Sequence, residues 1–153
     1  MGKWTEDVEE LVHQGRIKVP YTWSVGETGS KFFLELRDHK KIWGTRCPLC
    51  RKVLVPARKI CGKCFRQVEE WVEVGSEGMV QTFTVVRYIS EVHPLKPPFG
   101  YAVILLDGAD TGMTHLLSGS DPGKWRSGMR VRAVFKEKRE GNILDIIYFK
   151  PVE

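Results

Sequence analysis

Residues 47–64 read Cys47-Pro-Leu-Cys50-Arg-Lys-Val-Leu-Val-Pro-Ala-Arg-Lys-Ile-Cys61-Gly-Lys-Cys64, and this stretch holds all four cysteines of the 153-residue chain. A two-residue spacer lets both thiolates of a pair point inward from one tight turn, and two such pairs supply four sulfur ligands to one metal ion. The spacing therefore predicts a metal site formed by Cys47, Cys50, Cys61 and Cys64.

Three other uses of the cysteines fit the sequence less well. Disulfides between cysteines three residues apart would be strained, and a redox Cys-x-x-Cys needs one pair in a βαβ setting. Iron accepts four thiolates as zinc does, but the short, cation-rich, hairpin-like gap between the pairs favours a zinc ribbon. Because the protein fills all four positions, we expect a structural zinc rather than a catalytic one.

Composition narrows the class of protein. The chain is 42% hydrophobic, and 24 Lys+Arg against 19 Asp+Glu give a net charge of +5 and a pI near 9.1. This balance suits phosphates, whether in nucleic acid or a phosphorylated cofactor, and also an acidic protein. No stretch approaches the ~18 apolar residues of a membrane span, and the N-terminus lacks an export-signal pattern, so we expect a cytoplasmic protein that binds no membrane.

The N-terminal part is predicted to be helical and extended. Residues 5–14 place apolar side chains at helical spacing and predict a short amphipathic helix. Residues 17–29 contain one proline and two glycines and predict an extended arm that carries Tyr21 and Trp23. Exposed aromatics on such an arm indicate that another surface covers them.

A second helix is predicted over residues 30–39, capped by Ser30. Residues 42–46 predict the strand that leads into the first cysteine pair, and residues 70–74 predict the strand that follows the second pair. Beyond them the pattern is β throughout, with strands predicted at 79–88, 101–106, 113–117, 129–136 and 143–149 and one compact turn at 121–128.

Five short strands with one insert before the fourth predict an OB-fold barrel. The fold class is therefore mainly β: an N-terminal helical segment, a rubredoxin-like zinc ribbon and a C-terminal five-stranded OB-fold barrel. The predicted boundaries are residues 1–41 for the helices and arm, 42–74 for the ribbon and 75–153 for the barrel.

With its helical segment, zinc ribbon and OB-fold barrel in this order, the chain resembles a known family of bacterial and archaeal proteins that join the same three parts and accompany acyl-CoA enzymes. Besides the two cysteine pairs and Trp71, the segments that carry the likeness are Gly29-Ser-Lys-Phe-Phe33, Val55-Pro-Ala-Arg58, Gly78-Met-Val-Gln-Thr-Phe-Thr-Val-Val86 and Gly123-Lys-Trp-Arg-Ser-Gly-Met-Arg-Val131. Together they span from about residue 15 to the C-terminus. The resemblance assigns the zinc ligands to the four cysteines.

The resemblance implies a non-catalytic accessory subunit of a hetero-oligomer. Its partner would be a thiolase-fold acyl-CoA enzyme, of the thiolase or hydroxymethylglutaryl-CoA synthase type, or an acyl-CoA hydratase or aldolase, and the chain would help to form the acyl-CoA site or channel. The sequence motifs are consistent with a non-catalytic role, because the chain has no Gly-rich phosphate loop, no Gly-x-Ser-x-Gly motif and no His-Glu-x-x-His motif. His93 and His115 are interpreted as ordinary polar residues.

The contact with coenzyme A is predicted at two places. Residues 91–100 form a loop stiffened by three prolines between the first two barrel strands, where OB-folds often bind ligands. The same residues fit a stiff surface loop without a ligand equally well. Our hypothesis is that this loop and the ribbon lie near the mouth of the partner's coenzyme A channel. The residues proposed for acyl-CoA or partner contact are Arg46, Lys52, Arg58, Lys96 and Phe99.

The alternative function is single-stranded nucleic-acid binding, because OB barrels and zinc ribbons recur in such proteins. Against it, the first barrel strand offers Phe83 and Tyr88 but few clustered cations. The sequence therefore favours the acyl-CoA role.

Overall fold

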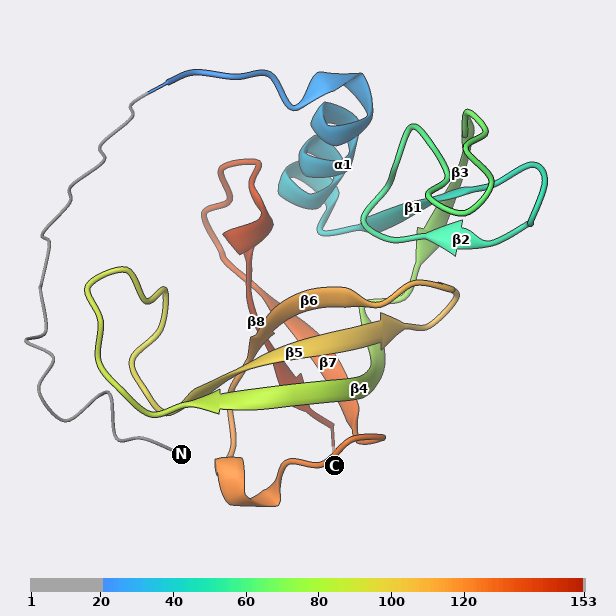
Figure 1. Cartoon of the computed structure of the whole chain (residues 1–153). Helices are drawn as coiled ribbons and strands as arrows, with labels where there is room; N and C mark the ends of the chain where they lie inside the picture. The colour runs from blue at the N-terminus through green and yellow to red at the C-terminus, as the bar shows by residue number, and fades with distance from the viewer. Residues whose placement is uncertain (1–20, 153) are drawn as a thin grey trace, which may run out of the picture.

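The computed structural model describes residues 21–152. It contains one helix, a three-stranded sheet and a five-stranded closed barrel (Figure 1). The predicted helix at 5–14 and the first residues of the predicted arm lie outside the described residues. The elements are α1 (Gly26–His39), β1 (Ile42–Arg46), β2 (Val53–Leu54), β3 (Glu70–Val74), β4 (Glu77–Val86), β5 (Phe99–Leu106), β6 (Met113–Leu117), η1 (Pro122–Lys124), β7 (Arg130–Phe135), η2 (Ile143–Asp145) and β8 (Ile146–Pro151).

Helix α1 begins four residues earlier than predicted. Ser30 therefore lies inside the helix and does not cap it, and Gly29 is a helical residue rather than a breaker. A glycine inside a helix costs about 1 kcal/mol relative to alanine, but packing of the apolar face outweighs this propensity. Phe32 and Leu36 provide that packing, since both are buried in the main core.

The ribbon sheet has the strand order β2-β1-β3, and all its pairs are antiparallel. The predictions of strands at 42–46 and 70–74 are confirmed residue for residue. Gly44 on β1 is required by close packing, because a Cβ there would lie 2.8 Å from the carbonyl oxygen of Leu54 and 2.9 Å from a methyl group of Val55.

The barrel closes in the order β4-β5-β6-β8-β7, with β4 paired to β7. Neighbours are antiparallel except β6 and β8, which pair in parallel. This is the predicted OB-fold, with η1 inside the predicted 121–128 turn. The last strand differs from its prediction: residues 143–145 form the 3₁₀ turn η2, because Asn142 and Asp145 make a reciprocal capping box there.

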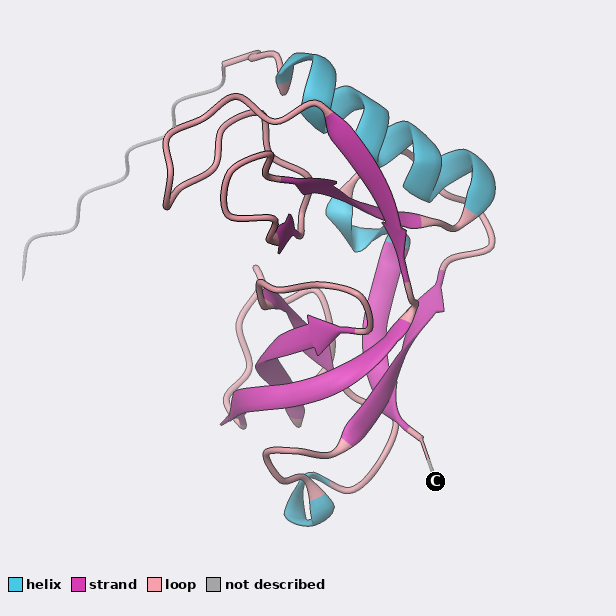
Figure 2. Ribbon diagram, turned by 90° about the vertical axis from the view of Figure 1, so that its right-hand side faces the viewer, coloured by secondary structure: helices cyan, strands magenta, loops and turns pink. Residues whose placement is uncertain are grey.

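One apolar core runs through all three predicted segments. It joins Phe32 of α1, Ile42 and Val53 of the ribbon sheet, and barrel residues such as Ile104 and Phe149. Figure 2 shows α1 and the ribbon sheet together at one end of the molecule and the barrel at the other. The three segments therefore pack as a unit, and the domain boundaries stay a prediction.

The loop between β5 and β6 fastens the ribbon to the barrel. Val53 donates its N–H to Asp110 Oδ2 at 2.8 Å, and Asp110 returns its own N–H to the carbonyl of Val53 at 2.9 Å. Thr111 Oγ1 accepts from the N–H of Val55 at 2.8 Å and donates to its carbonyl at 3.1 Å. These bonds satisfy the free edge of β2 and fix the orientation of the ribbon.

Candidate metal centre and basic ribbon surface

The four predicted cysteine ligands come together. Their Sγ atoms all lie within 4.8 Å of one another, and Cys50 Sγ is 3.8 Å from Cys61 Sγ. A tetrahedral site with Zn–S bonds of about 2.3 Å has edges of about 3.8 Å, so this cluster fits a tetrathiolate metal ion. Its surroundings are Leu54 and Val68, which together with the cysteines form a small core of their own.

The two cysteine turns have the same backbone geometry. In each turn, the residue that follows the second cysteine donates its N–H to the carbonyl of the first cysteine. The next residue along the chain accepts, at its carbonyl, the N–H of that same first cysteine. The bonds are Arg51 N to Cys47 O at 3.0 Å, Cys47 N to Lys52 O at 3.0 Å, Phe65 N to Cys61 O at 2.8 Å and Cys61 N to Arg66 O at 2.9 Å. Such repeated turns aim all four sulfurs at one point.

The turns also set the thiol acidities. The backbone N–H of Cys50, helped by that of Leu49, lowers the pKa of Cys47 to about 7. Burial raises the pKa of Cys64 to about 12, and the nearby sulfur of Cys50 adds to this. A metal ion bound to all four sulfurs would favour the thiolate form of each, including that of Cys64.

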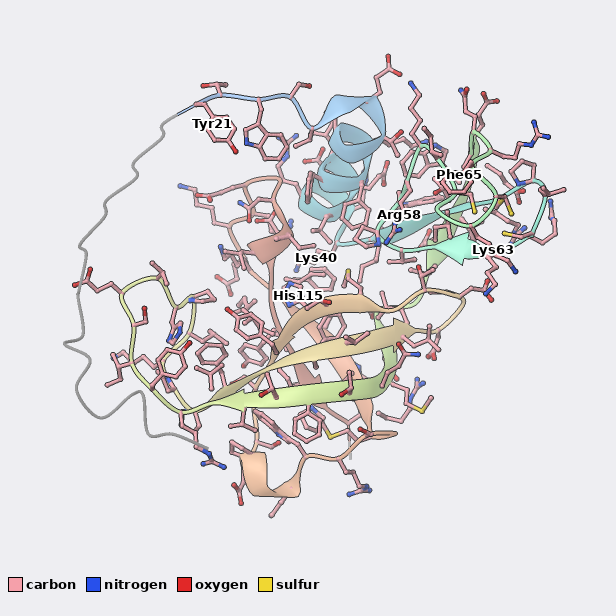
Figure 3. The ribbon with its side chains drawn as sticks, viewed as in Figure 1. Tyr21, Lys40, Arg58, Lys63, Phe65 and His115 are labelled. Carbon is pink, nitrogen blue, oxygen red and sulfur yellow. The ribbon has the colours of Figure 1, made fainter. Side chains whose placement is uncertain are left out.

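The ribbon surface around the cluster is strongly basic. Residues 46–66 hold seven Lys and Arg and no acid. Arg46 pairs with Glu70 at 2.6 Å and Arg51 approaches the same carboxylate at 3.5 Å. Among the described residues, the other five have no carboxylate partner within 4.0 Å; they are Lys52, Arg58, Lys59, Lys63 and Arg66. We call this set the basic ribbon surface (Figure 3).

The predicted contact residues do not form one site. Lys52 and Arg58 are exposed on the ribbon, and Arg46 is half-buried. Lys96 is exposed on the β4–β5 loop, which Figure 1 places at the side of the barrel away from the ribbon. Lys96 and the ribbon cations are therefore separate on this chain, and their contact with the mouth of a partner's channel stays a prediction.

Phe99 also requires correction as a contact residue. It is 0% exposed at the start of β5, where it packs with Val86 and Leu116 and edge-on to His93 at 5.2 Å. A buried ring of this kind supports the loop from beneath and offers no surface to a ligand.

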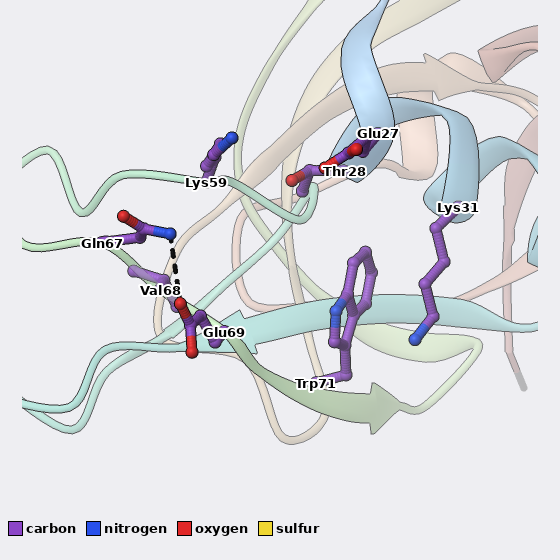
Figure 4. A pocket seen from close by; sticks show the side chains of 8 residues that line it. All are labelled: Glu27, Thr28, Lys31, Lys59, Gln67, Val68, Glu69 and Trp71. Atoms are coloured by element: carbon purple, nitrogen blue, oxygen red, sulfur yellow. Dashed lines mark hydrogen bonds between the residues drawn. The ribbon is translucent and has the colours of Figure 1, made fainter.

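A hollow of about 300 Å³ lies between the start of α1 and the ribbon (Figure 4). Lys31 Nζ lies 4.3 Å from the ring centroid of Trp71, a cation–π contact that joins helix to ribbon. Gln67 donates to Glu69 at 3.1 Å on the opposite wall. The hollow is lined by both acidic and basic side chains, and some of them already contact one another. It is therefore interpreted as a gap between the packed helix and ribbon rather than as a ligand site.

Exposed apolar side chains gather around two further hollows. One, of about 540 Å³, lies between α1 and the loop before η2, and the other, of about 180 Å³, lies beside β5 and β6; Ile143 lines both. We call their exposed apolar rim the apolar band: it consists of Trp23 (66% exposed), Val25, Leu34, Tyr101 and Leu144. Of these, only Trp23 was singled out from the sequence.

The basic ribbon surface includes residues that sequence reasoning missed. Lys59, Lys63 and Arg66 of this surface were not singled out as site residues, although the acid-free run at 46–66 could have indicated them, and neither was Phe65, which lies next to them in sequence. Helix spans able to cross a membrane are not found among residues 21–152.

Fold and site together define a protein with a cysteine ribbon joined to an OB-fold barrel. Residues 71–136 match the family profile described as "ChsH2, C-terminal OB-fold domain". A "DUF35 domain-containing scaffold protein" of Methanocaldococcus jannaschii is 34% identical over 123 residues, covering 77% of this chain and 86% of the relative. The chain belongs to the DUF35 family.

Two further relatives agree with this assignment, and one more solved structure shares the fold. A "DUF35 domain-containing scaffold protein" of Pyrococcus furiosus is 27% identical over 80% of this chain and 92% of its own. A crystal structure of a DUF35 protein of unknown function from Sulfolobus solfataricus has a TM-score of 0.59 at 28% identity, covering 71% and 78% of the two chains. The "Ltp2-ChsH2(DUF35) aldolase" has a TM-score of 0.63 at 20% identity, covering 85% and 98%, and shares the fold.

Proposed function

We propose that this protein is a non-catalytic accessory subunit that docks on a thiolase-fold acyl-CoA enzyme and helps to form its acyl-CoA site. The observation that carries the proposal is kinship: the M. jannaschii relative, 34% identical, is described as a scaffold protein. The structural neighbour described as the Ltp2-ChsH2 aldolase, an assembly with an enzyme, points the same way. We propose that the protein acts in the cytoplasm.

The metal in this proposal is a structural zinc ion. Four cysteines at tetrahedral spacing would hold it, and its role is to keep the ribbon folded and its cations in place. Because the protein supplies every ligand, no position is left for a substrate. The thiols are free of disulfides, as metal binding requires.

The basic ribbon surface is proposed to face the acyl-CoA. Coenzyme A carries three phosphate groups, and cations without carboxylate partners can bind them without first breaking an ion pair. Within residues 21–152, Lys52 and Arg58 have no carboxylate partner, whereas Arg46 is held by Glu70 and serves to position the ribbon. Lys96 lies on the barrel side and is proposed as a partner contact.

The apolar band is proposed to contact the partner enzyme. Isolated apolar side chains on a surface are ordinary, but several exposed apolar side chains around two hollows that share Ile143 are typical of a protein interface. Leu34 on α1 and Leu144 of η2 belong to this set.

Charge reversal tests the acyl-CoA role. In the assembled complex, Arg58→Glu should raise the Michaelis constant for the acyl-CoA about tenfold, because a repulsive charge replaces an unpaired attractive one. Lys150→Glu, an exposed cation on β8, is the matched control. An unchanged Michaelis constant for Arg58→Glu would remove Arg58 from the site.

Assembly is the test of the proposal as a whole. The tagged full chain, expressed with the acyl-CoA enzymes of its own host, should retain one of them, and thioester turnover should require both proteins. Salt-sensitive binding of a single-stranded oligonucleotide at micromolar protein, without enzyme capture, would favour the nucleic-acid alternative instead.

A further inference from the structure

We propose that Phe65 and the cations beside it form a binding site for a phosphorylated purine nucleotide, with the base stacked on the Phe65 ring. This inference rests on the proposed function in one respect: the nucleotide is taken to be the adenosine 3′,5′-bisphosphate end of coenzyme A. It adds a residue, a ligand moiety and an orientation to the proposed role of the ribbon.

The first observation is the backbone at Phe65. Its φ is 54°, in the left-handed region that glycine adopts freely and that is rare for a bulky side chain. The equivalent position of the first cysteine turn, Arg51, has a φ of 60°. Both turns therefore place a large side chain where glycine would fit without strain, and backbone strain of this kind clusters at functional sites.

The second observation is where the strained backbone puts the ring. Phe65 is 80% exposed, although its N–H is bonded to the carbonyl of Cys61 at 2.8 Å. The ring contributes nothing to either apolar core that contains ribbon residues. A rigidly mounted, exposed aromatic face loses little conformational freedom when a base stacks on it.

The third observation is the charge around the ring. Lys63 and Arg66 flank Phe65 in sequence, and Figure 3 shows Lys63 and Phe65 at the same outer part of the ribbon. Neither cation has a carboxylate within salt-bridge distance in the described part of the chain, and no acid occurs between residues 46 and 66. Cations next to a stacking platform are what a phosphorylated nucleotide requires, whereas an uncharged ligand would need only the ring.

The apolar band lacks this combination, which is why the nucleotide is assigned to the ribbon. The band offers the exposed aromatics Trp23 and Tyr101, but its neighbouring cation, Arg37, is bonded to Asp38 at 2.8 Å.

Phe65→Gly provides the test, since it removes the ring while relieving the backbone. The zinc-loaded full chain is titrated by calorimetry with adenosine 3′,5′-bisphosphate, coenzyme A and pantetheine. We expect the first two to bind and pantetheine not to bind. Phe65→Gly should weaken adenosine 3′,5′-bisphosphate about tenfold or more without lowering the melting temperature, while Phe65→Trp should retain binding.

Tyr21→Ala, which removes another exposed aromatic, is the control and should leave binding unchanged. The inference is overturned if Phe65→Gly binds the bisphosphate as tightly as the wild type, if pantetheine competes with coenzyme A, or if an oligonucleotide binds more tightly than the bisphosphate. A Phe65→Gly chain that still assembles with its enzyme and binds the bisphosphate normally would discard this site and leave the proposed function standing.

Discussion

His115 on β6 is a buried histidine that works as a neutral residue. It is 5% exposed, Nδ1 accepts from the N–H of Leu116 at 2.8 Å, and Nε2 lies 3.1 Å from the carbonyl of Ile143, to which it donates. Burial lowers the pKa of His115 below the usual value near 6.5. His115 is thus a strand residue, as interpreted from the sequence, and the structure adds that it is buried.

This burial predicts a pH dependence of stability. The unfolded chain takes up a proton at His115 near pH 6.5 that the folded chain resists, so the free energy of unfolding should fall as the pH drops below about 6.5 and level above it. His115→Gln should show a shallower fall between pH 7.5 and 5.5 in urea titrations. Equal slopes for both proteins would contradict the assignment, since loss of metal at low pH affects both alike.

Gly44 predicts a local packing cost. Gly44→Ala would push a methyl group against the backbone of β2, and crowding of this kind costs about 1–3 kcal/mol. Gly62→Ala is the control, because its nearest new contact is a flexible Arg58 atom at 3.9 Å. Chemical denaturation of the two variants should separate them by at least about 1 kcal/mol; similar stabilities would show that β1 and β2 can move apart freely.

At the scale of elements, the β5–β6 loop holds the ribbon through Thr111. Thr111→Val keeps the shape but leaves the N–H and carbonyl of Val55 without partners, which costs about 1–3 kcal/mol. Thr114→Val, on the exposed side of β6, should change stability by less than about 0.5 kcal/mol. If the two variants were equally stable in urea, the loop would not be what fastens the ribbon.

The ribbon should also depend on its metal more than the barrel does. Its small core consists of the four cysteines, Leu54 and Val68, whereas the main core is rooted in the barrel. A chelator should therefore expose the amides of residues 47–68 to hydrogen exchange while those of β4 to β8 remain protected. Simultaneous exchange throughout the chain would show that metal and barrel form one cooperative unit.

Patterns that depend on local chemistry were readable from the sequence. The strands at 42–46, 70–74 and 113–117 were predicted with the observed bounds, because alternation and turn residues enclose them. The cysteine cluster followed from spacing alone. The start of α1 could not be predicted in this way, because tertiary packing of Phe32 outweighs the low helix propensity of Gly26 and Gly29.

Features that depend on the closed barrel could not be predicted. An apolar residue after a proline-rich loop reads equally well as a contact residue or a buried one, and only the register of β5 places Phe99 inside. The apolar band joins α1 to a loop more than 100 residues later, through Ile143. Phe65 was not singled out because its distinguishing feature is a positive φ angle, which the sequence does not reveal.

At the scale of the whole molecule, the two surfaces are separate. The basic ribbon surface lies at one end of the molecule, whereas the apolar band lines hollows beside α1, η2 and the barrel strands β5 and β6. Such a division lets the chain hold an enzyme with one surface and face a charged ligand with the other. The account therefore predicts that the two roles can be removed independently.

Leu34→Glu should act on docking alone. A charge in the apolar band should weaken assembly with the enzyme about tenfold or more, because an interface core excludes unpaired charges. Met79→Glu is the control, as Met79 is 41% exposed on β4 and Leu34 is 45% exposed. Binding of adenosine 3′,5′-bisphosphate to the isolated chain should be unaffected by either change.

The most direct measurement is light scattering on a size-exclusion column, applied to the full chain purified with its acyl-CoA enzyme, with thioester turnover assayed across the eluted peak. We expect one hetero-oligomeric peak that carries the activity, and no activity in the isolated chain. Two separate peaks, or thioester turnover by this chain alone, would contradict it.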